Sequence, residues 1–484
     1  MSVVVDGYGL TLEEVVAVAR DGAEVELAAD VAGRMAQTRR IMERAVDAGE
    51  PVYGATTGVG ALKRVAIHGA GAADFNRLMV LNCRVGQGPP AKHDVVRATL
   101  LRLVNGLARG VTGVRPLLAD LVVRALNEDW QIDVRTIGSP GDADLAPMAD
   151  LISGLLDREQ LALAAGEGLA LVDNTSFSTA VAALALADAF ALADWLDGAA
   201  ALDLEAFLAT PSALHSILRE RPYPGLQEVA ARMRALLEGS ALYEPGVARH
   251  LQDPLTFRCI PQIHGALRDA LAHTAGQVAI ELNAAHSNPL VDVDEERIVS
   301  VGCFESVALS AALDYLRIAF APVLTSAAER TVKLLHAGHS GLPPGLAEEP
   351  EIGDDGYNEF GLAAQSLTAE ARLLAAPVSF ELVTSSQAEG IEDRMTMAPL
   401  SGRRLAEMLE LGRSLVAVEL VVAARAVDMR PGHRLGEGTA ALHSLVRVCI
   451  PATTAGQPVP ADMRPLTSLV GASSGPLVAL WGAV

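Results

Sequence analysis

The chain has 484 residues, half of them hydrophobic, and a formal net charge of −21 at pH 7. This charge argues against nucleic acid or an anionic membrane surface as a partner, because both repel an acidic protein. The chain is long enough to bury a large core, and its abundant Ala, Leu and Val favour long helices packed through small side chains.

Hydrophobic periodicity predicts a mainly helical protein. The predicted helices lie, in chain order, in two patterns within 11–48 and in a segment around Leu78 and Leu81, then at 93–109, 114–128, 148–164, 178–208, 262–284, 304–338, 361–376 and 401–429. Between them we expect a Gly/Thr-rich loop at 51–60, a turn at 86–90, a connecting region at 210–255 and a small hairpin from 291–293 and 298–301. Helices of this length are typical of a bundle, and their continuous Ala/Leu faces predict an oligomer.

A tight loop is predicted at 138–147, which reads GSPGDADLAP. Gly138 and Gly141 permit unusual backbone angles, and a helix opens with Pro147 in its first turn. Asp142 or Asp144 can cap that helix.

Targeting and metal-binding signals are not evident. The segment MSVVVDGYGLTLEE is acidic and lacks the pattern of a signal peptide, and no uninterrupted apolar run reaches the ~18–20 residues that span a bilayer. Four cysteines, at 83, 259, 303 and 449, form no CxxC pair and no zinc spacing. We therefore expect a cytoplasmic protein that binds no metal.

Several motifs in order along nearly the whole chain resemble the histidine, phenylalanine and tyrosine ammonia-lyases and aminomutases. PVYGATTGVG is similar to the family's PVYGVNTGFG, and GLARGVTGVRP to SLAKGYSGVRP. Four further segments also match. GEGLALVDNTSFSTA resembles KEGLALINGTQxSTA, and QDPLTFRCIPQIHG resembles QDxYSLRCxPQVxG. ELNAAHSNPL resembles EINAxxDNPL, and SSQAEGIEDRMTM resembles the SANQEDHVSM region. Several motifs in order are far more specific than one.

The resemblance implies a mainly α fold, a long-helix bundle of the aromatic ammonia-lyase (fumarase/aspartase-like) type with a smaller, loop-rich N-terminal part. We place the N-terminal part at 1–203 and the bundle with the C-terminal helices at 204–484. The resemblance also implies a homotetramer, because each pocket in that family takes residues from several subunits.

The 138–147 loop departs from the family at its centre. In the family's GSxG-ASG-DLAP segment, the Ala-Ser-Gly triad cyclises into an electrophilic methylidene-imidazolone (MIO). Here Gly138-Ser139 and Asp144–Pro147 match the flanks of the family segment. Between them lies Pro140-Gly141-Asp142-Ala143, which is one residue shorter than the family's stretch and contains no Ser-Gly. The sequence as written encodes no MIO, so we expect no cofactor. If Ala143 stands for a matured triad, the electrophile is restored.

Five residues match functional positions of the family. Tyr53 matches the tyrosine that takes the β-proton, although a phenol with a pKa near 10 needs polarised surroundings to act as a base. Arg258 matches the carboxylate-binding arginine, whose planar fork suits an acid. Gln252, Phe304 and Glu392 match pocket positions, where packing or a structural hydrogen bond is an equal interpretation.

Other positions of the pocket motifs differ. Asn82 and Cys83 stand where histidine-type enzymes have the Ser-His pair that contacts the substrate ring. Asp173 replaces the asparagine that supports the electrophile, and Leu255 and Cys303 replace a tyrosine and an asparagine. Cys83 is either a nucleophile or acid, or a small buried side chain.

Acid–base chemistry remains without the electrophile. Asp142 and Asp173 in one pocket would split their pKa values, so that one serves as a general acid. Tyr53 or Glu392 would be the base, and Arg258 would hold an acidic small-molecule substrate. The sequence therefore predicts a cofactor-independent lyase or isomerase acting on a small carboxylate-bearing or amino-acid-derived compound. The alternatives are a catalytically silent binding or structural protein, and a true MIO ammonia-lyase or aminomutase.

Overall fold

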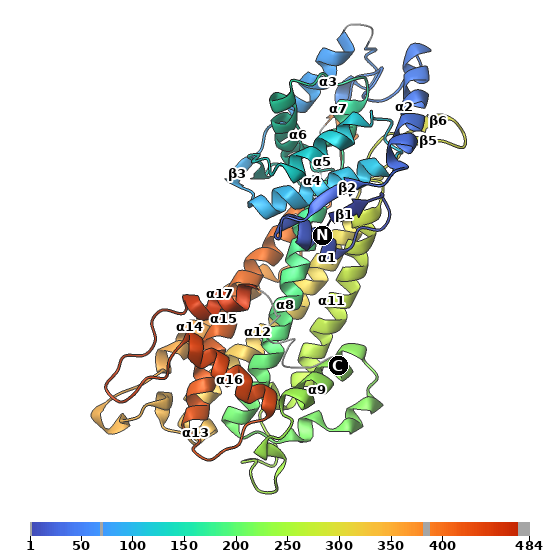
Figure 1. Cartoon of the computed structure of the whole chain (residues 1–484). Coiled ribbons are helices and arrows are strands. Elements are labelled where there is room, and N and C mark those ends of the chain that lie inside the picture. The colour runs from blue at the N-terminus through green and yellow to red at the C-terminus, as the bar shows by residue number, and fades with distance from the viewer. Residues whose placement is uncertain (1, 68–70, 381–387, 473–484) are drawn as a thin grey trace. The chain divides into compact units, whose positions relative to one another are not determined.

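The computed structural model describes residues 2–67, 71–380 and 388–472, and long helices dominate them (Figure 1). Contacts divide the chain into two compact units, each assembled from three stretches. Unit 1 comprises Met1–Ala187, Thr274–Leu313 and Pro377–Arg403, and unit 2 comprises Asp188–His273, Asp314–Ala376 and Arg404–Val484. The contiguous parts 1–203 and 204–484 stay a prediction.

Unit 1 contains mostly short helices and three two-stranded sheets among its described residues. Its helices are α1 (Leu12–Ala19), α2 (Val31–Asp47), α3 (Gly71–Asn82), α4 (His93–Ala108), α5 (Leu117–Asn127), α6 (Leu145–Glu159) and α7 (Glu167–Val172). Parallel strands β1 (Ser2–Val5) and β2 (Glu24–Leu27) pair Val3 with Val25. Antiparallel pairs join β3 (Gln87–Pro90) to β4 (Arg135–Ile137) and β5 (Leu290–Asp292) to β6 (Arg297–Val299).

Four long helices run through the residues of both units: α8 (Ser176–Phe207), α11 (Ile260–Asn283), α12 (Val307–Leu335) and α15 (Ala398–Asp428). Unit 2 adds α9 (Pro224–Leu236), α10 (Leu255–Arg258), α13 (Ala337–Ser340), α14 (Asn358–Leu374), α16 (Glu437–Cys449) and α17 (Arg464–Ala472). The predicted helices at 178–208, 262–284 and 401–429 and the predicted hairpin are thereby confirmed.

Two local predictions were wrong. Gln87–Pro90, within the predicted turn at 86–90, form strand β3, because the extended backbone of Pro89 and Pro90 suits an edge pairing with β4. The region 210–255 contains the 13-residue helix α9, which opens with Pro224 and buries Leu226, Val229 and Met233 at helical spacing.

Two described segments, Glu167–Phe207 and Val307–Leu335, are long and apolar enough to cross a bilayer by length and composition alone. The structure buries 72% and 61% of their most apolar windows. Core helices pass the same test, and α8 has this character, since Trp195 and most of its alanines are fully buried.

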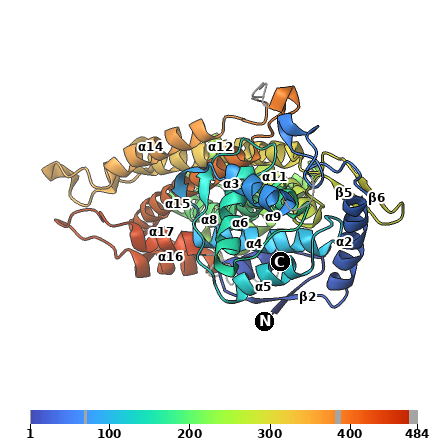
Figure 2. The same cartoon turned by 90° about the horizontal axis from the view of Figure 1, so that it is seen from above.

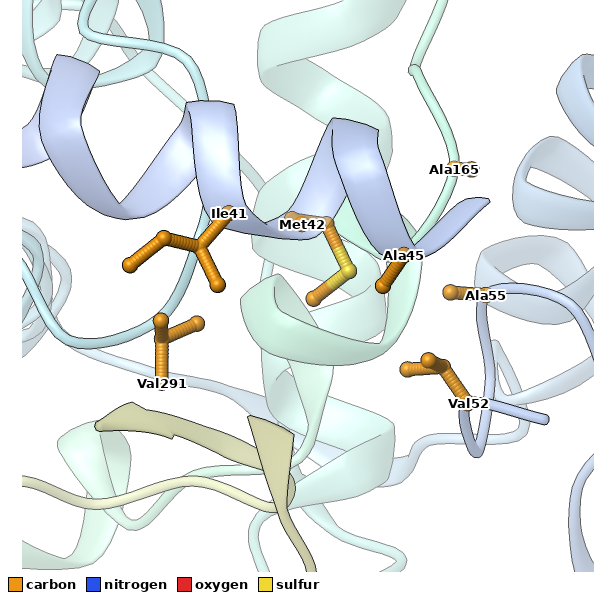
Figure 3. Packing of buried hydrophobic residues seen from close by; sticks show 7 residues of the cluster. All are labelled: Ile41, Met42, Ala45, Val52, Ala55, Ala165 and Val291. Atoms are coloured by element: carbon orange, nitrogen blue, oxygen red, sulfur yellow. The ribbon is translucent and has the colours of Figure 1, made fainter. Parts of the chain in front are cut away.

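The loop that carries Tyr53 is anchored by hydrophobic packing on both sides of that residue. Val52 and Ala55 join a buried cluster with α2, which lies beside the β5–β6 hairpin (Figure 2). Figure 3 shows this cluster, made of Ile41, Met42, Ala45, Val52, Ala55, Ala165 and Val291. This packing fixes the position of the backbone at Tyr53.

A buried ion pair holds the start of α7. The Glu167 carboxylate is fully buried and accepts hydrogen bonds from Arg115 Nε at 2.7 Å and Nη2 at 2.6 Å. The backbone N–H groups of Arg115 and Ala164 donate to the same carboxylate at 3.0 and 2.7 Å. Four donors compensate for the loss of water around the charge.

We expect Glu167→Ala to lower the free energy of unfolding by about 3–5 kcal/mol, because it strands the Arg115 guanidinium beside buried backbone donors. Thermal unfolding followed by circular dichroism measures the change. Glu159→Ala is the control, since Glu159 pairs with Arg124 at 2.5 Å on the partly exposed surface and should cost less than about 1 kcal/mol. Equal shifts in the two variants would contradict this assignment.

Candidate active site

A cavity of about 610 Å³ lies within unit 1. Its wall comes from the Tyr53 loop, the C-terminal end of α3, the loop before α6, α7, the segment between β6 and α12, and the segment before α15. Six of the nine predicted site residues line it: Tyr53, Cys83, Asp142, Asp173, Phe304 and Glu392. The Tyr53 loop, the 138–147 loop, α7 and the segment before α15 therefore meet at one cavity.

Three predicted site residues lie elsewhere. Asn82 is exposed and does not line the cavity, because neighbouring residues at a helix end point in different directions. Arg258 and Gln252 line a second cavity, of about 370 Å³, in unit 2. There the Arg258 guanidinium donates a hydrogen bond to the Gln252 side-chain oxygen. Their roles in substrate binding stay predictions.

The Tyr53 phenol accepts a hydrogen bond from the Gly60 N–H at 2.9 Å. Burial raises the pKa of Tyr53, and the carboxylates of Asp173 and Glu392 raise it further, whereas the Gly60 bond lowers it. The phenol is therefore neutral at pH 7, which suits a proton donor better than the predicted base.

The 138–147 loop is fixed against the segment that precedes α15. Thr396 Oγ1 donates to the Gly141 carbonyl at 2.8 Å, and Met397 N donates to Pro140 O at 2.9 Å. Gly141 has φ +106°, and a Cβ there would collide with Thr396, so the position requires glycine. The next residue, Asp142, thereby faces the cavity.

The predicted caps of α6 are corrected by the structure. Asp144 stands at the N-cap position but makes no side-chain cap bond. Its buried carboxylate instead accepts from the backbone N and Oγ of Ser178, at 2.7 and 2.5 Å. Burial raises the pKa of Asp144 to about 6 despite these bonds. At the start of α6, Ser139 Oγ accepts the Ala146 N–H at 3.0 Å.

Three carboxyl groups share the cavity: those of Asp142, Asp173 and Glu392. Burial raises the pKa of Asp142, and burial together with the Asp142 charge raises that of Glu392. The pKa of Asp173 is raised well above its usual value, first by burial and then by the charges of Asp142 and Glu392. Asp173 is only 7% exposed. The cavity therefore combines strongly and moderately perturbed acids.

Two basic side chains also line the cavity, and each has an acidic neighbour. Lys63 Nζ lies 3.6 Å from Glu389, and Arg394 Nη2 lies 3.7 Å from Glu305. Lys63, Glu305 and Asp393 line the cavity without having been predicted as site residues. Only Asp393 has a sequence signal, because it directly follows Glu392 in the motif. The first three residues of SSQAEGIEDRMTM lie outside the described residues.

The chain is similar to known proteins along nearly its whole length. A family model described as aromatic amino acid lyase matches residues 10–160 and 155–448. Histidine ammonia-lyase of Stigmatella aurantiaca is 35% identical over 96% of this chain and 96% of that relative. The structure of ergothionase, the ergothioneine degrading enzyme of Treponema denticola, superposes with a TM-score of 0.91 at 25% identity, covering 98% and 99% of the two chains. The structure of tyrosine aminomutase from Streptomyces globisporus superposes with a TM-score of 0.90 at 28% identity, covering 100% of this chain and 99% of that chain.

The pKa of Cys83 depends on the charges around the cavity. Burial, followed by the charges of Glu392, Asp173 and Asp142, raises the pKa of its thiol from 9.0 to about 11. Only the thiolate is nucleophilic, so the thiol is a weak nucleophile at neutral pH.

We expect the rate of Cys83 alkylation by iodoacetamide to keep rising up to about pH 11 instead of levelling near pH 9. Well below both values, the two-unit difference in pKa leaves about a hundredfold less thiolate. Peptide mass spectrometry measures the rate. Glu392→Gln should shift the profile to lower pH, whereas Glu159→Gln, outside the cavity, should not. A profile that levels near pH 9 would refute the acidic environment.

Proposed function

The chain belongs to the aromatic amino acid lyase family, and we propose that it is a lyase or isomerase that uses acid–base proton transfer without MIO. Its substrate is a small carboxylate-bearing or amino-acid-derived molecule. The observation that carries the proposal is the convergence of Tyr53, Asp142, Asp173 and Glu392 in one cavity. Perturbed acids that share a cavity are characteristic of catalytic sites.

The residues of the 138–147 loop do not fit MIO. The electrophile needs a serine to lose water and a following glycine to close the ring. Asp142 and Ala143 stand between Gly141 and Asp144 instead. Ala143 is fully buried, with φ +117°. This mismatch supports a reaction carried by side-chain acids and bases.

The different environments of the carboxyl groups suggest that one acts as the general base and another as the general acid. Glu392 is half-buried, whereas Asp173 is buried and has the stronger upward pKa shift. The Glu392 carboxylate takes a proton from a substrate carbon, and the C–H electron pair becomes the new double bond. The bond to the leaving group breaks with its electron pair, and Asp173 or Asp142 protonates that group unless it departs as a neutral amine.

Arg258 would anchor the substrate carboxylate. Its fork matches a carboxylate, and Gln252 already orients it. We propose that a second subunit of a homotetramer supplies this anchor, as the family resemblance implies. We also propose that the enzyme is cytoplasmic.

A true MIO ammonia-lyase or aminomutase is the second candidate, because relatives named histidine ammonia-lyase match over nearly the full chain. In that case Ala143 represents a processed triad. A catalytically silent binding protein is the third.

Intact mass spectrometry of the purified protein separates the first two candidates. We expect the mass of the encoded chain, because no triad is present to cyclise. A deficit of two waters relative to the gene, together with an encoded triad, would overturn the proposal in favour of the MIO enzyme.

Turnover assays test the catalytic roles. Histidine, tyrosine and ergothioneine, the compounds named for the relatives, and their derivatives form the substrate panel, with absorbance of the unsaturated product as readout. For a substrate that turns over, Glu392→Gln and Asp173→Asn should each lower kcat by roughly 10²–10⁴-fold. Glu159→Gln is the control. Unchanged kcat in both variants would refute the roles, and no turnover by the wild type would favour the silent protein.

A further inference from the structure

A buried acid pair in unit 2, Asp203 of α8 and Glu419 of α15, shares a single cationic partner. That partner is Arg330 of α12, and none of the three side chains is exposed to solvent. Arg330 Nε lies 2.8 Å from Asp203 Oδ2 and 3.1 Å from Glu419 Oε1, and Nη2 donates to the same Glu419 oxygen at 2.7 Å. One guanidinium therefore faces two carboxyl groups.

The neighbouring elements do not balance the second negative charge of the acid pair. His264 of α11 lies near the pair, but its Nδ1 is bonded to Asp197 of α8 at 2.8 Å. Burial lowers the pKa of His264, so its imidazole is neutral at pH 7. Arg268, also on α11, is paired with Asp197. From α10, the Thr256 carbonyl accepts a hydrogen bond from Arg330 Nη1 at 3.4 Å.

Two oxygen atoms of the acid pair lack a donor. Asp203 Oδ1 and Glu419 Oε2 are buried without a hydrogen-bond partner among the described residues, and the two carboxyl groups lie within hydrogen-bonding range of each other. Two buried carboxylates this close repel, and a buried oxygen without a donor costs free energy. A proton on one carboxyl group relieves both, because its O–H donates to the other group and the site becomes neutral overall.

We propose that Asp203 and Glu419 share one proton in the folded protein, and that loss of this proton at alkaline pH destabilises unit 2. Burial, followed by the Glu419 charge, raises the pKa of Asp203 well above its usual value, against the lowering effect of Arg330. Deprotonation leaves two buried carboxylates beside one guanidinium, which is costly. The acid pair lies in unit 2 and the candidate active site in unit 1, so this inference does not depend on the proposed function.

The direction of the pH effect follows from where the proton is bound. In the unfolded chain both carboxyl groups are ionised above about pH 5, whereas the folded acid pair retains one proton. Because the folded state then binds one proton more, the pair makes the unfolding equilibrium constant rise about tenfold for each pH unit. This rise ends at the pH where the folded pair itself loses the proton.

Denaturant unfolding of the full-length protein between about pH 6 and pH 8 tests this linkage. Glu419→Gln keeps the shape of the side chain, and its amide can donate to Asp203, so no shared proton is needed. We expect its unfolding constant to rise less steeply than that of the wild type, by about tenfold per pH unit, and Asp203→Asn should act in the same way. Glu410→Gln is the control and should leave the slope unchanged, because Glu410 is exposed on α15 and pairs with Arg413 at 2.8 Å.

Infrared spectroscopy in heavy water locates the proton, because a protonated carboxyl group absorbs at a higher frequency than a carboxylate. Glu419→Gln and Asp203→Asn should each lose one protonated-carboxyl band relative to the wild type, since either change leaves one acid that Arg330 keeps ionised. Loss of the band in only one variant, loss in neither, or slopes equal to that of the wild type would overturn the proposal. Each variant can contradict the proposal by itself, so the test holds if the other does not fold.

Discussion

Burial of carboxyl groups, together with repulsion between their charges, is the constraint on which the chemistry of the cavity in unit 1 depends. Burial raises the pKa of Asp173 most, and the charges of Asp142 and Glu392 raise it further. Burial, followed by the charges of Glu392, Asp173 and Asp142, likewise raises the pKa of Cys83. The Asp142 charge also raises the pKa of Glu392, after burial, so the ionisation of one carboxyl group affects that of its neighbours in the cavity. A ligand that changes the charge of Asp142 therefore changes the proton affinity of Asp173, Glu392 and Cys83.

Backbone packing holds these groups close together. The Thr396 hydroxyl donates to the Gly141 carbonyl and lies so close that no side chain fits at position 141. Val52 and Ala55 anchor the Tyr53 loop. Gly141 and Thr396 are far apart in the sequence, so the tertiary fold determines where the acids are attached to the cavity wall.

The sequence was sufficient to predict the long helices and the convergence of Tyr53, Asp142, Asp173 and Glu392, because hydrophobic periodicity and ordered motifs carry that information. It was not sufficient for contacts decided by tertiary geometry. The Asp144 carboxylate turns to Ser178 rather than to its own helix, and Asn82 lies outside the cavity that its neighbour Cys83 lines. Neither outcome follows from spacing, because each depends on how another element approaches.

The discontinuous make-up of unit 1 has a consequence for biosynthesis. Its last stretch ends at Arg403, so roughly four-fifths of the chain must leave the ribosome before Thr396 and Glu392 can join the earlier segments. Until then the apolar faces of the first 187 residues lack part of their partners. Large proteins with such distant contacts expose hydrophobic surface while they wait, and nascent unit 1 is therefore a natural client for a chaperone.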